Sequence, residues 1–383
     1  MTPARSTSAP GGPLKEPWWR EWPLALAVVT LTLMLLGKAW IATALNQPAM
    51  LIALLLIICG VILIAAVAIV HHADVLAHRL GEPAGTLLLT LVITGLEVAM
   101  VAFVMSTGAE KPTLARDTMV AVVMLVLNGF MGLALLLGGL RHREQPYNLQ
   151  SANSFLVMII PLAVLGLVMP NYTRATPGPT LTSFQMVFLS LMSIGIYGVF
   201  LVVQNHLHRG FFTLPEAAAE AHASVATHEH HSGRPTLYHA AMLGLYGAPL
   251  VVLAKQLAAP LDAMVIRLGA PPALSGFVMA VLVLTPESIA AIRAALANRL
   301  QRSVNVLLGS VLASIGLTIP LVIAISLATG RVLVLGVDGT DAVMLLLSLI
   351  TTTITFSTPR TNVLLGSVHL LLFSAYFMLM FDR

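Results

Sequence analysis

Long apolar runs, repeated along the whole chain of 383 residues, constrain its fold more than any other feature. About 20 consecutive apolar residues in a helix cross the hydrocarbon layer of a membrane, because every backbone N–H and C=O there must be paired within the segment. Charged residues make up only 9% of the chain, whereas soluble domains carry about 25%. A soluble surface cannot be built from this composition, so we predict an all-α polytopic membrane protein.

Eleven such runs predict about eleven transmembrane helices. They lie near residues 24–45, 49–70, 86–106, 117–139, 152–169, 183–204, 237–258, 273–296, 303–328, 341–357 and 362–381. The first run is too long for the apolar core of a cleavable signal peptide, so we expect it to be retained as a helix.

The Lys and Arg residues predict how the chain is oriented. If the N-terminus is inside and the helices alternate, 12 of the 20 Lys and Arg residues lie on the cytoplasmic side, among them Arg141 and Arg143. Cytoplasmic loops carry such an excess, which also accounts for the net charge of +4 without nucleic acid as a partner. We expect a cytoplasmic N-terminus and a C-terminus on the opposite side of the membrane.

A pattern in the third run recurs in the eighth. A Gly-x-Pro triplet precedes each run, and each run contains one acidic residue three positions after a threonine, Glu97 after Thr94 and Glu287 after Thr285. Runs two to six and seven to eleven therefore form two repeats of five helices. Because five is odd, the repeats are upside down relative to one another, as in many secondary transporters.

This duplication divides the chain into five parts. They are a cytoplasmic tail at 1–23, an extra transmembrane helix at 24–48, a first repeat at 49–204 with its motif at about 81–140, a His-rich cytoplasmic linker at 205–236, and a second repeat at 237–383 with its motif at about 269–328. The spacing of His228, His230 and His231 in the linker allows a regulatory metal or pH sensor, and a flexible solvated linker is the alternative.

Two glutamates are the candidate functional residues. Only Glu97 and Glu287, of 16 acidic residues, lie well inside an apolar run. A charged side chain at the bilayer centre costs on the order of 2.5–3.5 kcal/mol on insertion scales, so two at corresponding positions indicate a functional site. Glycine and proline can interrupt a helix and free backbone carbonyls for a cation. We expect such breaks at Gly95, Pro286, Gly129 and Gly309.

Hydroxyl and amide groups close to these glutamates are the candidates for further ligands. Two carboxylates offer at most four oxygens, whereas Ca²⁺ takes about six to eight. In membrane helices, Ser and Thr often bond a carbonyl of their own helix instead. The candidate ligands are Thr94, Thr285, Asn128, Ser288, Ser310 and Ser314, among which Asn128 and Ser310 rank highest.

Paired buried carboxyls also predict exchange. Burial disfavours the ionised carboxyl and a bound cation favours it, so cations and protons compete for the same oxygens. Two protons replace one divalent cation without changing the charge of the site. A proton gradient can therefore drive cations out of the cytoplasm.

The repeated motif resembles the α-repeats of the calcium/cation antiporter superfamily over about residues 60 to 380. The similarity is to its bacterial calcium and sodium/potassium proton antiporters, at Gly81-Glu82-Pro83-Ala84-Gly85-Thr86, at 112–118, at 137–145 and at Thr285-Pro286-Glu287-Ser288. The resemblance implies export of Ca²⁺, Na⁺ or K⁺ in exchange for protons, with Glu97 and Glu287 as the cation-binding acids. It also implies a bacterial inner-membrane protein, whose N-terminus is then cytoplasmic and whose C-terminus is periplasmic. Many members have Asn where this chain has Thr94 and Thr285, which leaves the choice of ion open.

Other classes of function are less consistent with the sequence. No nucleotide-binding or catalytic motif occurs, so we expect neither an enzyme nor a cofactor, and the partners are inorganic cations, protons and the lipid bilayer. A cation channel usually builds its acidic ring by oligomeric symmetry. A non-transporting membrane protein could use the paired glutamates structurally. The internal duplication favours the antiporter.

Overall fold

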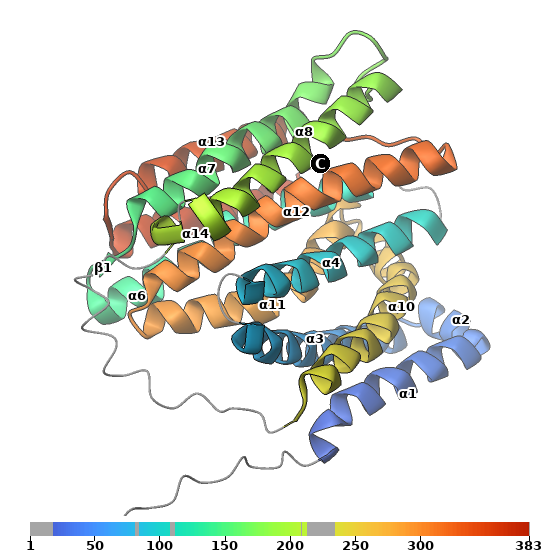
Figure 1. Ribbon diagram of the computed structural model, residues 1–383. Helices are drawn as coiled ribbons and strands as arrows, with labels where there is room; N and C mark the ends of the chain where they lie inside the picture. The colour runs from blue at the N-terminus through green and yellow to red at the C-terminus, as the bar shows by residue number, and fades with distance from the viewer. Residues whose placement is uncertain (1–17, 81–83, 108–111, 208, 213–233, 383) are drawn as a thin grey trace, which may run out of the picture.

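The computed structural model describes residues 18–80, 84–107, 112–207, 209–212 and 234–382 as a bundle of long helices (Figure 1). In chain order, the elements are η1 (Trp18–Glu21), α1 (Trp22–Leu36), α2 (Lys38–Asn46), α3 (Pro48–Leu80), α4 (Ala84–Thr107), α5 (Leu114–Met124), η2 (Leu125–Phe130), α6 (Met131–His142), β1 (Gln145–Pro146), α7 (Leu149–Ala163), η3 (Val164–Val168), η4 (Met169–Asn171), α8 (Ser183–Val202), η5 (Val203–Leu207), η6 (Arg209–Phe212), α10 (Thr236–Leu268), α11 (Ala273–Leu296), α12 (Leu300–Thr329), α13 (Gly339–Thr355), β2 (Arg360–Thr361) and α14 (Val363–Met380).

The helices follow the predicted apolar runs. Within the described residues, nine helices are long and apolar enough to cross a membrane, and two shorter apolar helices lie at Leu91–Met105 and Gly339–Thr355. The nine and the two together occupy the places of the eleven predicted runs. Several helices are longer than their apolar run; α3, for example, continues to Leu80 and α10 to Leu268.

The first predicted helix differs from the expectation, because it is divided into α1 and α2 at Gly37. A Cβ atom at Gly37 would lie 2.6 Å from the backbone oxygen of Leu33, so the chain can bend here only with glycine. Both helices lie at the edge of the bundle (Figure 1).

The two five-helix repeats pack reciprocally, as expected for an inverted pair. The first helices of the repeats, α3 and α10, pack against each other. The second helix of each repeat packs against the third helix of the other, α4 against α12 and α11 against α5 and α6. In the same way, α8 packs on α12 and α14 packs on α6.

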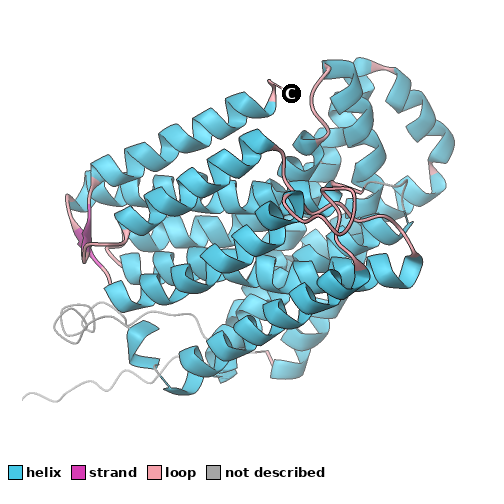
Figure 2. Ribbon diagram, turned by 90° about the horizontal axis from the view of Figure 1, so that it is seen from above, coloured by secondary structure: helices cyan, strands magenta, loops and turns pink. Residues whose placement is uncertain are grey.

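The helix ends define two faces of the bundle. On the first, the Arg141 face, His142 bonds the carbonyl of Leu296 and β1 pairs with β2, a two-stranded ladder seen at one end of the molecule in Figure 2. On the opposite, Arg331 face, Arg331 bonds the carbonyl of Met105 and Arg267 bonds the carbonyl of Leu45. Each face therefore joins the first repeat to the second.

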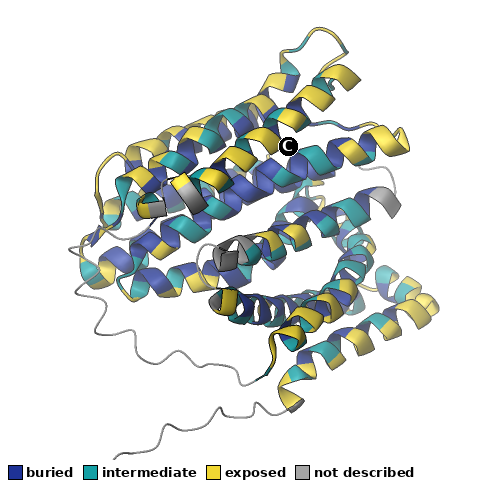
Figure 3. Cartoon of the chain, in the orientation of Figure 1, coloured by how far each residue is buried: buried dark blue, intermediate teal, exposed yellow. Residues whose placement is uncertain are grey.

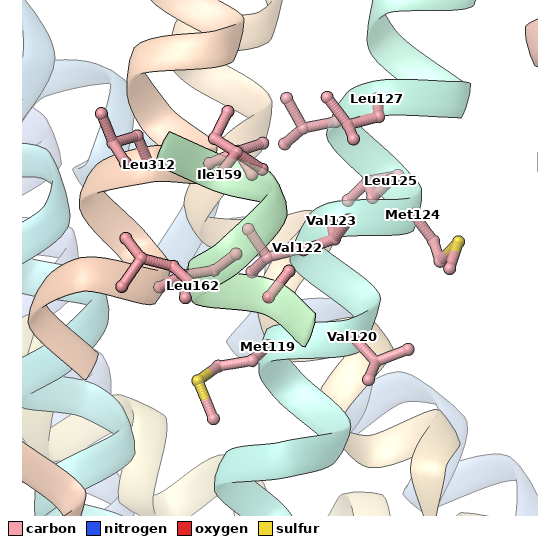
Figure 4. Close-up of a cluster of buried hydrophobic side chains, with 14 of the residues drawn as sticks. Met119, Val120, Val122, Val123, Met124, Leu125, Leu127, Ile159, Leu162 and Leu312 are labelled. Carbon is pink, nitrogen blue, oxygen red and sulfur yellow. The ribbon is translucent and has the colours of Figure 1, made fainter. Parts of the chain in front are cut away.

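The core lies around α5, whose eleven residues are all buried. Figure 4 shows Leu127 pointing toward Ile159 and Val122 pointing toward Leu162 of α7, with Leu312 of α12 on the same side. The burial map in Figure 3 shows α12 largely buried within the bundle, whereas α1 carries an exposed face. This packing places the third helix of each repeat at the centre, next to the helices that carry the glutamates.

Candidate functional site

The two glutamates lie on the second helix of each repeat. Glu97 of α4 is 3% exposed and Glu287 of α11 is 7% exposed. Helix α12 packs against both α4 and α11, so one helix lies next to both carboxyls. The inverted repeat thus brings together two acids that are 190 positions apart in the sequence.

Both carboxyls accept a hydrogen bond from α12. The Ser314 hydroxyl donates to Oε2 of Glu97 over 2.5 Å, and the Ser310 hydroxyl donates to Oε1 of Glu287. Residues four apart lie on one face of a helix, one above the other. One face of α12 therefore connects the acids of the two repeats.

Two oxygens of this site are buried and lack a partner in the described part of the chain. They are Oε1 of Glu97 and the hydroxyl of Ser288, which follows Glu287 on α11. A buried polar atom left unpaired costs about 1–3 kcal/mol, and more when it is charged. Both atoms are oxygens, so a bound hard cation would satisfy them.

The two threonines of the motif differ from Ser310 and Ser314 in their hydrogen bonding. Thr285 donates its hydroxyl to the carbonyl of Val281 in its own helix, as such side chains commonly do. Thr94 is buried at 2% exposure on α4. Within the described residues, the hydrogen bonds to the glutamates come from the serines of α12.

Asn128 lies in a second buried polar cluster. Its amide nitrogen donates to Ser348 over 2.7 Å, and its amide oxygen lies 3.2 Å from Nδ1 of His369. Because an amide oxygen only accepts, Nδ1 of His369 carries the proton and Nε2 accepts from Thr355 over 3.0 Å. Among the described residues, Asn128 thus bonds α13 and α14 and neither glutamate. In the sequence, only the polar residues inside the last two apolar runs indicated that such a buried cluster exists.

The expected helix breaks are absent at three of four positions, which corrects that prediction. Helix α4 continues through Gly95, α11 through Pro286 and α12 through Gly309. A single glycine leaves the backbone hydrogen bonds of a helix intact, and α11 continues past Pro286 although a proline removes one hydrogen bond and crowds the carbonyl four residues before it. Gly129 lies within η2, a π-helical segment between α5 and α6. The third helix of the first repeat is therefore irregular next to Asn128.

The histidine motif of the linker lies outside the described residues, including His228, His230 and His231. In the described ranges, no three His, Cys, Asp or Glu side chains gather where they could hold a metal ion.

Two inverted repeats and a pair of buried carboxyls define an ion transporter of the secondary type. Sequence comparison supports this class, because the family model described as sodium/calcium exchanger protein matches residues 50–205 and 238–381. The chain belongs to this family, within the calcium/cation antiporter superfamily, and is of the ChaA type. The resemblance stated from the sequence is confirmed.

Known relatives cover most of the chain. It is 46% identical over 329 residues to the y4hA protein of Sinorhizobium fredii, described by its name as an ionic transporter, which covers 86% of this chain and 88% of that one. It is 39% identical over 320 residues to the sodium-potassium/proton antiporter ChaA of Escherichia coli, which covers 84% and 86%. The solved structure of native YfkE has a TM-score of 0.71 at 15% identity, covering 94% of this chain and 100% of that chain, and shares the fold.

Proposed function

We propose that this chain is a secondary antiporter that exports Ca²⁺, Na⁺ or K⁺ from the bacterial cytoplasm in exchange for protons. Glu97 and Glu287 bind the cation or protons in turn. The observation that carries the proposal is the bridge from α12, in which Ser314 and Ser310 each donate to one of the two buried carboxyls.

The oxygens of the site suit a hard cation. The two carboxyls offer four oxygens, and the hydroxyls of Ser288, Ser310 and Ser314 offer three more. Hard cations such as Ca²⁺ prefer oxygen ligands of this kind. The serine hydroxyls also stabilise the carboxylates when no cation is bound.

The exchange follows from the charge of the site. An empty site with two carboxylates is doubly negative, and it is neutralised by one Ca²⁺ or by two protons. Na⁺ or K⁺ neutralises one carboxylate and leaves the second for a proton. Since the same oxygens hold either ligand, cations and protons cross the membrane in opposite directions.

We place the Arg141 face in the cytoplasm and the protein in the inner membrane, because the excess of Lys and Arg lies on that side. We also propose that residues 205–236 link the two repeats. The two segments matched by the family model, which leave 206–237 between them, support this division.

The experiment measures cation-induced loss of an internally acid pH gradient in everted membrane vesicles. Ca²⁺, Na⁺ and K⁺ are added separately to wild type and to Glu97→Gln and Glu287→Gln. We expect at least one cation to dissipate the gradient in the wild type and none to do so in either variant, because each amide removes a charge from the site. Glu144→Gln, at an exposed acid on the Arg141 face, is the matched control and should transport like wild type.

Either of two results would refute the proposal. The first is a wild type that dissipates the gradient with none of the three cations, which would favour a channel or a structural role. The second is transport at wild-type rate in both glutamate variants, which would place the exchange site elsewhere. Monodisperse protein in detergent shows that the variants remain folded.

A further inference from the structure

A pair of buried histidines joins the first helices of the two repeats near the Arg141 face. His72 of α3 is 3% exposed and His239 of α10 is 0% exposed. Their Nδ1 atoms lie 2.9 Å apart. The pair is separate from the glutamate site, since it lies on other helices and shares none of its hydrogen bonds.

Glu21, which directly precedes α1, closes this cluster. Its Oε2 atom lies 3.3 Å from Nε2 of His72 and accepts from Tyr246 over 2.9 Å. Its Oε1 atom accepts from Tyr238 over 2.6 Å and lies 4.0 Å from Arg234. One carboxylate therefore ties the start of α1 to both α3 and α10.

The geometry allows one added proton and no more. A carboxylate only accepts, so Nε2 of His72 carries a proton. In the neutral pair, His239 then donates from its Nδ1 to Nδ1 of His72. When one proton is added at Nε2 of His239, the Nδ1 proton of His239 passes to Nδ1 of His72, so that a charged His72 donates in the reverse direction. With both rings charged, two N–H groups would face each other over 2.9 Å, which breaks the pair.

The other charged and titratable groups around the histidine pair make separate contacts and do not take its place as the group that binds a proton. On α3, His71 contacts His72 through its ring, and Arg79 bonds Thr236 and the carbonyl of Arg234. The Arg234 guanidinium lies over the Tyr238 ring at 4.3 Å. Since arginine stays charged and Glu21 is a carboxylate, His72 and His239 are the groups of this cluster whose charge can change near neutral pH.

A metal ion does not fit this arrangement. The two Nδ1 atoms face each other at hydrogen-bond distance, and Glu21 contacts the opposite nitrogen of His72. The three side chains therefore do not point to a common centre, as metal ligands must.

We propose that His72, His239 and Glu21 form a binding site for a single proton, which reports cytoplasmic pH. When the proton binds, the His72–Glu21 hydrogen bond becomes an ion pair and holds α1 more firmly on α3 and α10. This part of the proposal rests on the antiporter function and the orientation proposed above.

The ion pair then slows exchange in an acid cytoplasm. A transporter must rearrange its helices to open the cation site alternately to each side. Helices α3 and α10 pack on α4 and α11, which carry the glutamates, and α1 packs on both α3 and α10. A stronger bond across α1, α3 and α10 opposes that rearrangement. An exchanger that admits protons is thereby restrained when protons are already abundant inside.

The first test does not depend on transport. The only four tryptophans are Trp18, Trp19, Trp22 and Trp40, so replacing all but Trp22 by phenylalanine leaves one fluorophore next to Glu21. The protein is titrated in detergent with a chelator and without transported cations. We expect a one-proton change in fluorescence between about pH 5 and 8. It should be lost in His72→Gln and His239→Gln, and it should persist in Glu97→Gln and in the control His71→Gln.

Glu21→Gln refines this test. The neutral amide no longer stabilises a charged His72, so the midpoint of the titration should shift to lower pH. A wild type without a transition, or a transition that survives in both His72→Gln and His239→Gln, would overturn the proton site.

The second test measures transport in everted vesicles, whose outer surface is the cytoplasmic face, as the bath pH is lowered. Relative to wild type, His72→Gln and His239→Gln should lose an acid-side fall in rate that His71→Gln retains. An unchanged pH profile in both variants would overturn the regulatory role. If no cation is transported at all, the proposed function fails, while the fluorescence titration still decides whether the proton site exists.

Discussion

Removing the hydroxyl of Ser314 should weaken cation binding without removing a charge from the site. In the structure this hydroxyl donates to Oε2 of Glu97 over 2.5 Å, while Oε1 of the same carboxyl has no partner within the described residues. Ser314→Ala therefore takes away the one hydrogen bond that the described structure gives to this carboxylate. The ionised form loses more than the protonated form, since hydrogen bonds to charged groups are the stronger ones.

The size of the effect follows from the strength of that bond. A hydrogen bond to a charged group contributes about 1.5–3 kcal/mol, and about 1.4 kcal/mol corresponds to a factor of ten, so the half-saturating cation concentration should rise about 10- to 150-fold. The upper end applies if the protonated carboxyl gains nothing from the hydroxyl. The pH at which protons displace a fixed cation concentration should move upward, because the protonated form is relatively favoured.

The assay is the rate of gradient loss in everted vesicles, measured against cation concentration at several values of pH. Ser303→Ala is the matched control, because this serine lies on the same helix and donates to the backbone carbonyl of Ala291 instead of a carboxyl. Its half-saturating concentration should equal that of wild type. If Ser314→Ala also matches wild type at every pH, while Glu97→Gln is inactive, the bridge from α12 does not contribute to cation binding.

Three further predictions concern competition, stability and packing. Lowering the pH by one unit should raise the half-saturating cation concentration by up to about 100-fold for a cation that replaces two protons. For a cation that replaces one proton, the increase should be about tenfold. Cation titrations at a series of fixed pH values measure both. Arg116→Gln should lower the unfolding free energy by about 3–5 kcal/mol, because it leaves buried Asp117 without its ion pair. Arg360→Gln, which removes an exposed ion pair, should lower it by less than about 1 kcal/mol. Thermal unfolding in detergent compares the two variants, and equal losses of stability would contradict the importance of the buried pair. Gly366→Ala should destabilise the protein by about 1–3 kcal/mol, because the added Cβ would clash with a backbone nitrogen of α6. Gly95→Ala, whose added Cβ would meet no atom within 4 Å, should stabilise α4 by about 0.5–1 kcal/mol and preserve transport.

The sequence predicted what depends on a single helix or on the repeat. Glu97 and Glu287 stood out as acids within apolar runs, and the duplication indicated that they meet. The run at 273–296 coincides with α11, because Pro271 and Pro272 precede it and the polar Asn298 and Arg299 follow it.

Features that depend on neighbours far apart in the sequence could not be predicted. Asn128 ranked high as a ligand by its type and position, but its partners Ser348 and His369 come from the last two helices, and no local pattern shows which helix faces it. Glu21 was assigned to the cytoplasmic tail, and its contacts with His72, Tyr238 and Tyr246 join three separate segments. The bend at Gly37 could not be predicted either, because the apolar run continues through it.

The bridge from α12 makes the site less symmetric than the fold that carries it. The architecture repeats, but both serine hydroxyls come from the second repeat, while Asn128, in the third helix of the first repeat, turns toward α13 and α14. The two acids therefore have different surroundings. Because Ser310 and Ser314 belong to one rigid helix, any displacement of α12 relative to α4 and α11 alters both hydrogen bonds at once. In the antiporter proposed above, we therefore expect loading and release to be linked across the two halves through this one helix.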